Sequence, residues 1–195
     1  FKAECVRRLD TWRVLGMRGT GSHDVALEGV FVPDAAIVAR RPPGQWHMLF
    51  HHIFALAFPL VYAAYVGVAE GARDRALEIA RAKPKTAALT IAAGRLENAF
   101  MRAEMSLDRM ISIAETEAAG PERTSRAAIA HTLTAEAAIA TVERAMELVG
   151  GSSFYRDLGL ERAFRDVQGA RFHPLQELPQ LELTGRVALG MGVDG

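Results

Sequence analysis

The sequence has 195 residues, half of them hydrophobic, with 23 basic and 23 acidic side chains. This is the composition of an ordinary soluble globular chain of one or two domains. Because the formal net charge is zero and no block of Lys or Arg occurs, the chain lacks the basic stripe that a nucleic-acid partner requires. The single Cys5 cannot form an intrachain disulfide, so a reducing cytoplasm is expected.

Residues 1–42 are predicted to contain strands around a glycine-rich turn. Apolar residues alternate with others before Pro33, at Val25, Leu27, Val30 and Val32, and this period is typical of a strand. The preceding segment WRVLGMRGTGS, residues 12–22, has three glycines in six positions and predicts a tight loop. Two or three strands bury too little apolar surface to be stable alone. We therefore expect 1–42 to be part of a larger β-domain.

Residues 43–195 are predicted to form an α-helical bundle. Breaks at Lys83-Pro84, Gly120-Pro121 and Gly150-Gly151 divide the helical pattern. The expected helices are 59–82, a second after Thr86, 121–149, 160–172 and a last one over 179–190. One face of the second helix is predicted to be apolar, at Leu89, Ala92, Leu96, Ala99, Phe100, Ala103, Leu107, Met110, Ile111 and Ala114. The fold class is therefore mainly α, with short antiparallel connections.

The apolar segment 48–69 has no Asp, Glu, Lys or Arg and is long enough to span a membrane. Because His51, His52 and Pro59 interrupt it, we expect a helix buried on nearly all sides in a protein core and no membrane partner. His47 and His51 have the helical spacing of a metal-ligand pair. No third ligand accompanies them, so no metal site is predicted.

Several phrases of the sequence occur in the order found in one enzyme superfamily. They are WRVLGMRGTGS at 12–22, VFVP at 30–33, VGVA at 66–69, LVGG at 148–151, LER at 160–162 and RD at 165–166. Over nearly its whole length the chain resembles the C-terminal half of the acyl-CoA dehydrogenase superfamily. This resemblance implies the end of a middle β-domain over 1–42 and a C-terminal four-helix-type bundle over 43–195. It also implies a flavin cofactor and a homotetramer arranged as a dimer of dimers.

The dehydrogenases of that superfamily need a carboxylate base, which removes a proton beside the thioester. The resemblance places this Glu eight residues after the Asp of the Arg-Asp pair, which is Pro174 here, or at the position of Leu60. Neither residue is a carboxylic acid. The sequence therefore departs from the dehydrogenase pattern at both positions.

The phrase RDVQGARFHP, which contains His173, resembles instead the flavin monooxygenases of this fold, such as dibenzothiophene and p-hydroxyphenylacetate oxygenases. That resemblance implies reduced FAD or FMN, O₂ addition at the C4a carbon of the flavin, and transfer of one oxygen atom to a small organic substrate. His173 is then the candidate catalytic side chain, because an imidazole of ordinary pKa near 6.5 exchanges protons at neutral pH. The other interpretation of His173 is a cation at a helix end.

Candidate flavin-binding residues on the bundle are Lys83, Lys85, Gly150 and Gly151. In the dehydrogenases an Arg at the first of these places meets the FAD pyrophosphate of a neighbouring subunit. A lysine cannot bind phosphate bidentately, and Glu147 stands where the family has Gln. These departures imply a loosely held flavin that a separate reductase supplies in reduced form. The alternative is that both lysines lie at a solvated helix end.

Four residues on or beside the glycine-rich turn complete the candidate site. Arg18 and Ser22 are expected at the flavin, and Trp12 and His23 at the substrate. A glycine loop that binds phosphate normally precedes a helix, whereas this one precedes a strand, so turn chemistry is the alternative interpretation. Two other functions stay open: an acyl-CoA dehydrogenase whose base comes from elsewhere, and a non-catalytic oligomerisation module.

Overall fold

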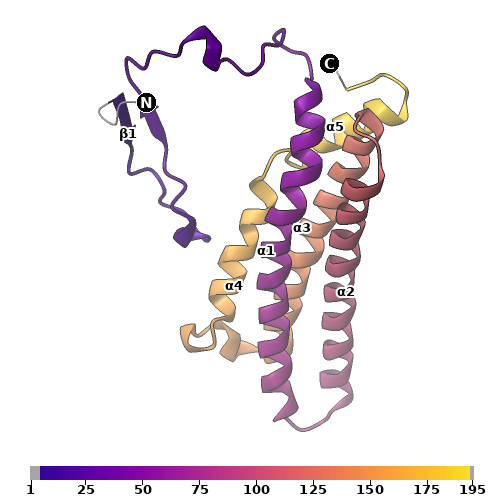
Figure 1. Cartoon of the computed structure of the whole chain (residues 1–195). Helices are drawn as coiled ribbons and strands as arrows, with labels where there is room; N and C mark the ends of the chain where they lie inside the picture. Colours follow the sequence, from indigo (N-terminus) through magenta and orange to yellow (C-terminus); the bar gives the residue numbers. More distant parts are fainter. Residues whose placement is uncertain (1–4, 194–195) are drawn as a thin grey trace.

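The computed structural model describes residues 5–193 and shows an N-terminal segment joined to an antiparallel helical bundle (Figure 1). The helices are α1 (Met48–Arg81), α2 (Ala87–Thr116), α3 (Pro121–Val149), α4 (Leu160–Val167) and α5 (Glu177–Ala188). Short 3-10 turns lie between α3 and α4, at Gly151–Phe154 and Arg156–Leu158, and directly after α4 at Gln168–Phe172. The predicted mainly α fold is confirmed.

Helix α1 begins eleven residues earlier than predicted, at Met48 rather than Pro59. The Nδ1 atom of His47 accepts a hydrogen bond of 3.1 Å from the backbone N–H of Leu49 and so caps the first turn. Pro59 lies inside the helix, where its ring removes one backbone hydrogen bond. The side chain of Pro59 is buried, and packing on this face compensates for the lost bond.

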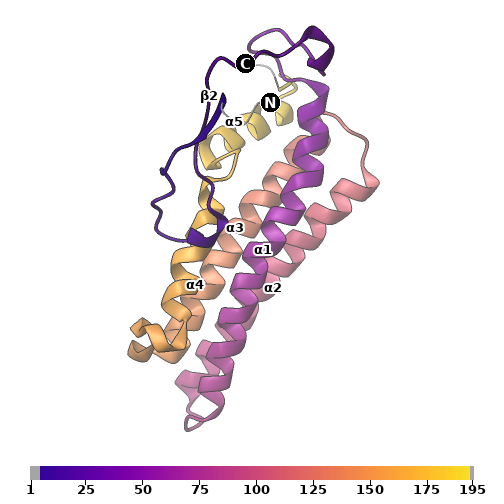
Figure 2. The same cartoon turned by 60° about the vertical axis from the view of Figure 1, so that its left-hand side comes forward.

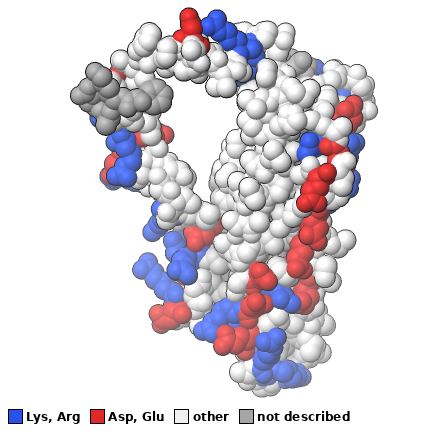
Figure 3. All heavy atoms as spheres, in the orientation of Figure 1, with Lys and Arg blue, Asp and Glu red and all other residues white. Residues whose placement is uncertain are grey.

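The expectation that segment 48–69 is buried on nearly all sides is wrong. One face of α1 packs against α2, α3 and α4, while a row of apolar side chains on another face is exposed, namely Leu49, Ile53, Leu56 and Leu60. Figure 3 shows an uncharged bundle surface facing the opening between the N-terminal segment and the bundle. By length and composition α1 could also cross a membrane, and 39% of its most apolar stretch is buried in this fold.

The core of the bundle is built from small side chains, above all alanines of α1 and α3 such as Ala69, Ala72, Ala138 and Ala145. Small side chains allow helices to approach closely. On α2 the buried face includes Leu96, Phe100 and Met110 as predicted, but Ile113 is buried and Ile111 is exposed. Ile113 lies three residues after Met110 and continues the same face, whereas Ile111 is turned about 100° away from Met110, because 3.6 residues make one helical turn.

The N-terminal segment carries two strands of three residues, β1 (Val6–Arg8) and β2 (Val25–Leu27), which pair antiparallel with Arg7 opposite Ala26. The strand expected to continue to Val32 stops at Leu27. No third strand pairs with β1 or β2 among residues 5–193. Residues 28–32 therefore have no neighbouring strand in this range with which to form a ladder of hydrogen bonds. Most side chains of both strands are exposed.

The C-terminal helices differ slightly from those predicted. The helix expected over 160–172 is α-helical to Val167 and continues as a 3-10 turn to Phe172. The last helix begins at Glu177 rather than Pro179. Pro179 lies in its first turn, where the missing N–H costs no hydrogen bond.

Candidate functional site

A cavity of about 660 Å³ lies between the glycine-rich loop, α1 and the segment that follows α4. Its walls come from three distant stretches of the chain, and Figure 2 shows the loop lying against α4. The lining residues are Trp12, Val14, Leu15, Gly16, Met17, Thr20, Ser22, Val61, Tyr65, Arg165, Gln168, Gly169, Phe172 and His173. Three sequence-predicted residues, Trp12, Ser22 and His173, thus meet at one cavity.

The loop is fixed to α4 by contacts at two adjacent residues. The backbone N–H of Met17 donates a 2.6 Å hydrogen bond to Oδ1 of Asp166. Gly16 lies so close to α4 that an added Cβ would be 2.1 Å from the carbonyl oxygen of Arg165. Only glycine allows this approach. The Arg165-Asp166 pair is therefore the anchor that holds one wall of the cavity against the bundle.

His23 and Arg18 do not line the cavity, since both make contacts within the loop. The Nδ1 atom of His23 accepts hydrogen bonds from the backbone N–H groups of Thr11 (3.2 Å) and Trp12 (3.1 Å). The guanidinium of Arg18 donates to the carbonyl of Val14 at 3.1 Å. Within this structure both side chains stabilise the turn, which agrees with the alternative interpretation of these residues as turn residues.

His173 lies where the 3-10 turn after α4 meets α1. Its Nε2 atom is 2.8 Å from the hydroxyl oxygen of Tyr65. One helical turn earlier on α1, the hydroxyl of Tyr62 donates to the carbonyl of Ala170 at 2.6 Å. Burial lowers the pKa of His173, so the imidazole is neutral at pH 7. Burial, with a smaller contribution from the Asp166 carboxylate, raises the pKa of Tyr65.

A second imidazole, that of His131 on α3, lies behind the tyrosines. It is 3% exposed, and its ring centroid is 4.3 Å from Tyr62 and 5.0 Å from Phe58. Among the described residues neither ring nitrogen has a hydrogen-bond partner. Burial, with a smaller contribution from the nearby His173, lowers the pKa of His131 to about 4. His131 is therefore neutral and acts as an aromatic core residue.

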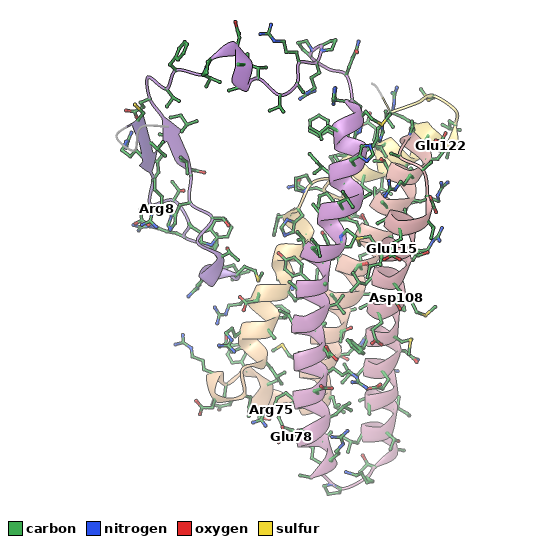
Figure 4. The ribbon with its side chains drawn as sticks, in the orientation of Figure 1. Arg8, Arg75, Glu78, Asp108, Glu115 and Glu122 are labelled. Carbon is green, nitrogen blue, oxygen red and sulfur yellow. The ribbon has the colours of Figure 1, made fainter. Side chains whose placement is uncertain are left out.

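No Asp or Glu is among the described residues that line the cavity. Leu60, one position where the dehydrogenase base would stand, is 76% exposed and lies outside it. Pro174, the other position, does not line it either. Acidic side chains lie elsewhere, for example Asp108 and Glu115 on α2 (Figure 4). A carboxylate base is thus missing from this cavity within residues 5–193.

Lys83 and Lys85 cap the ends of two helices in this structure. The ammonium group of Lys83 donates to the carbonyl of Val149 at 2.7 Å, at the end of α3. That of Lys85 donates to the carbonyl of Arg81 at 2.6 Å, at the end of α1. Gly150 ends α3 with a φ of 81°, and Gly151 follows it. None of these four residues lines the cavity, and their role at a flavin stays a prediction.

The two histidines considered as a metal pair have other contacts. His47 caps α1, and a ring nitrogen of His51 is 2.6 Å from the hydroxyl oxygen of Thr124. In the described part of the chain, no three His, Cys, Asp or Glu side chains are grouped as metal ligands.

Sequence reasoning missed Tyr62 and Tyr65, which hold the turn that carries His173. The only signal was their hydroxyls, three residues apart within a long apolar segment. A buried tyrosine requires a hydrogen-bond partner, so such a pair indicates a polar contact. It does not identify the partner, which here lies more than 100 residues away in the chain.

Comparison with known proteins identifies relatives of this chain. A family model described as the acyl-CoA dehydrogenase C-terminal domain matches residues 60–177. The chain is 28% identical to a putative acyl-CoA dehydrogenase, YdbM, of Bacillus subtilis, over 85% of this chain and 44% of the relative. It is also 28% identical to a pigment production hydroxylase of a Rhodococcus species, over 97% of this chain and 55% of the relative.

The fold also matches a solved structure. KijD3, in complex with FMN and a dTDP-linked amino keto sugar, superposes with a TM-score of 0.85 at 24% identity, over 98% of this chain and 50% of that chain. The chain therefore spans about half the length of the relatives that it matches.

Proposed function

The chain belongs to the family of acyl-CoA dehydrogenase C-terminal domains, and from this membership we propose that the whole protein is a flavin-dependent monooxygenase. The observation that carries the proposal is the composition of the cavity wall. It contains the His173 imidazole and, within the described residues, no carboxylic acid. A desaturating dehydrogenase requires a base for the proton beside the thioester, whereas oxygen transfer requires a group that holds a proton at the transferred oxygen.

The residues around the cavity fit the ring system of a flavin. The wall is mostly apolar, with Trp12 and Phe172 as flat aromatic surfaces and with Ser22, Arg165 and His173 as polar groups. Such a slot suits a planar heteroaromatic ring with polar edges. Lys83, Lys85, Gly150 and Gly151 lie outside this cavity, so we propose that they meet a flavin only across a subunit boundary, in a homotetramer.

Reduced flavin, when bound, supplies the electrons that activate O₂ for transfer of one oxygen atom to the substrate. The chain's own side chains control water and protons around that reaction. The apolar wall excludes water, which would otherwise divert the oxygen to hydrogen peroxide. The neutral imidazole of His173 keeps one N–H donor and one acceptor nitrogen, so it can hold a proton at the oxygen atom that is transferred.

The proposal is tested on the intact protein with reduced FMN or FAD and ¹⁸O₂. A substrate panel of phenols follows from the resemblance to p-hydroxyphenylacetate oxygenases, and a panel of nucleotide-linked amino sugars follows from the ligand of the matched complex. We expect a product that carries one ¹⁸O atom by mass spectrometry. Because general acid–base groups contribute about 10²- to 10⁴-fold, His173→Asn should lower product formation by at least roughly 100-fold and release hydrogen peroxide instead. His52→Asn, at an exposed histidine on α1, is the control.

Acyl-CoA dehydrogenation is the second candidate, favoured by the name of the Bacillus relative. It is tested by mixing the intact protein with bound oxidised FAD and a series of acyl-CoAs without oxygen. A dehydrogenase would lose the flavin absorbance within the time of mixing. Bleaching of this kind, together with no ¹⁸O in any product, would contradict the monooxygenase proposal.

A further inference from the structure

The hydroxyl of Tyr65 has one partner among the described residues, the Nε2 atom of His173 at 2.8 Å. Tyr65 borders the cavity but is only 3% exposed. If the hydroxyl accepted a proton from Nε2, its own proton would have no acceptor in the described part of the chain. Because buried donors are almost always satisfied, the hydroxyl donates to Nε2.

The position of this hydroxyl is set by Gly169, on the 3-10 turn that leads to His173. An added Cβ at Gly169 would lie 2.7 Å from the hydroxyl oxygen of Tyr65, closer than a side chain allows. On the same face of α1, the hydroxyl of Tyr62 donates to the backbone carbonyl of Ala170. One tyrosine thus holds the backbone of the turn, and the other reaches the imidazole.

We propose that Tyr65 is a positioning residue which holds neutral His173 in the tautomer that carries its proton on Nδ1. A neutral imidazole has one N–H, and an acceptor at Nε2 places it on Nδ1. Nδ1 is then the nitrogen that donates a hydrogen bond to the transferred oxygen. This last step rests on the proposed monooxygenase function, whereas the tautomer does not.

The other titratable and charged groups on the elements around His173 come from three helices and from its own turn. They are Tyr62 on α1, His131 on α3, Arg165 and Asp166 on α4, and Arg171 on the turn. A charge on His173 opposes a charge on His131, because two imidazolium ions would repel each other. His131, Arg165, Asp166 and Arg171 stay in place in every variant compared below, so their effects cancel, and Tyr62 is changed only in the control.

The test measures the charge of His173 directly, by mass spectrometry of hydrogen exchange at the imidazole C2 atom across a pH series. The intact protein, Tyr65→Phe and Tyr62→Phe are compared without flavin or substrate. Removing the Tyr65 hydroxyl takes a hydrogen-bond donor from the neutral imidazole. In the charged imidazole Nε2 carries a proton, and a hydroxyl that turned to accept it would leave its own proton without an acceptor, so the neutral form loses more. We therefore expect the ratio of charged to neutral His173 at a fixed pH to rise on the order of three- to tenfold in Tyr65→Phe, the equivalent of one net hydrogen bond.

Tyr62→Phe is the matched control, since it removes a buried hydroxyl that holds the same turn through its backbone and gives no hydrogen bond to the imidazole. It should change that ratio much less than Tyr65→Phe does. Gly169→Ala displaces the Tyr65 hydroxyl from the other side and should raise the ratio as Tyr65→Phe does. If Tyr65→Phe does not fold, the ratio is measured in Gly169→Ala instead. A fall in the ratio would mean that Tyr65 accepts from Nε2. A fall, no change, or an equal rise in Tyr62→Phe would each overturn the proposal.

The charge of His173 also separates this inference from the proposed function. If oxygen transfer fails in every assay and the ratio still rises in Tyr65→Phe, the tautomer assignment stands and the monooxygenase function falls. If oxygen transfer is found and the ratio does not rise, only the role of Tyr65 is wrong.

Discussion

Gly16 is the residue through which the glycine-rich loop reaches the bundle. A Cβ at this position would overlap the backbone of Arg165, and backbone cannot turn aside as a flexible side chain can. We expect Gly16→Ala to push the loop off α4 and break the bond from Met17 to Asp166. The affinity for flavin, measured by the quenching of flavin fluorescence, should fall at least about tenfold, since one lost charge-assisted hydrogen bond is worth about 1.5–3 kcal/mol.

Gly19→Ala is the matched control, because a Cβ at Gly19 meets nothing within 4 Å. It should bind flavin as the unchanged protein does. Equal losses in the two variants would show that the loop as a whole, and not its approach to α4, determines binding.

His131 should make stability depend on pH. Its pKa in the folded chain is about 4 against 6.5 as the ordinary value. Below pH 6.5 the unfolded chain binds a proton at His131 that the folded chain does not bind. The contribution of neutral His131 to the free energy of unfolding is therefore fully present above this pH and declines as pH falls toward 4. The loss is at most about 3 kcal/mol. We expect His131→Phe to flatten the decline in urea-unfolding measurements between pH 6.5 and 4.

His52→Phe, at an exposed position of α1, should keep the original decline. The depressed pKa of His173 acts in the same direction, so part of the decline should remain in His131→Phe. A variant with an unchanged slope would show that His131 is not the buried group responsible.

At the residue scale, the sequence predicted the residues of the cavity better than their contacts. Trp12, Ser22 and His173 all line it. These residues could be predicted because a glycine-rich turn and a His-Pro phrase are recognisable from local sequence. His23 and Lys83 instead bond to nearby backbone groups. Such hydrogen bonds depend on which backbone groups of another segment lie nearby in the folded chain, and a local sequence pattern does not predict this.

Among the elements, α1 and α2 are joined by one ion pair with two parallel bonds. The guanidinium of Arg73 donates to both carboxylate oxygens of Glu97 at 2.7 Å, and it lies 4.9 Å from the centroid of the Phe100 ring. The hydrogen bonds from Arg73 lower the pKa of Glu97. A lysine cannot make this forked contact.

We expect Arg73→Lys to lower the free energy of unfolding by about 0.5–1 kcal/mol, a value moderated by partial exposure. Arg144→Lys is the control, because Arg144 pairs with Glu147 within α3 and joins no two helices. Thermal unfolding of both variants checks the comparison. A larger loss at Arg144 would contradict a stabilising role for the contact between helices.

The elements themselves were largely predictable from hydrophobic period and breaks. α2 and α3 begin and end close to the prolines and glycines that flank them. α1 was predicted too short because Pro59 was taken as a boundary, whereas packing on its buried face carries the helix through it. The N-terminal strands were predicted too long, since strand length depends on partners that a local pattern does not reveal.

For the whole molecule, we propose that the bundle assembles into the homotetramer that the family resemblance implies. Apolar side chains border a groove between α2 and α3, among them Met105, Ile129 and Leu133. We expect light scattering to give the mass of four chains. Leu133→Glu should dissociate the tetramer, because a charge buried in an apolar contact costs several kcal/mol.

Val38→Glu is the control, since Val38 is 100% exposed in the N-terminal segment and should leave the mass unchanged. A monomeric intact protein would contradict the proposal. We also expect the 195-residue chain alone to show little turnover, because it spans about half the length of its relatives. Turnover by this chain at the rate of the intact protein would be the opposite result.

Tyr62 and Tyr65 both reach the turn that carries His173 from one straight stretch of helix. Each residue of an α-helix turns the next by about 100°. A single codon inserted or deleted between Pro59 and Tyr65 would therefore rotate one or both hydroxyls away from their partners, even though the helix itself continued. Substitutions on the outer side of α1 should be tolerated in descendants of this gene, whereas changes of length in this stretch should not.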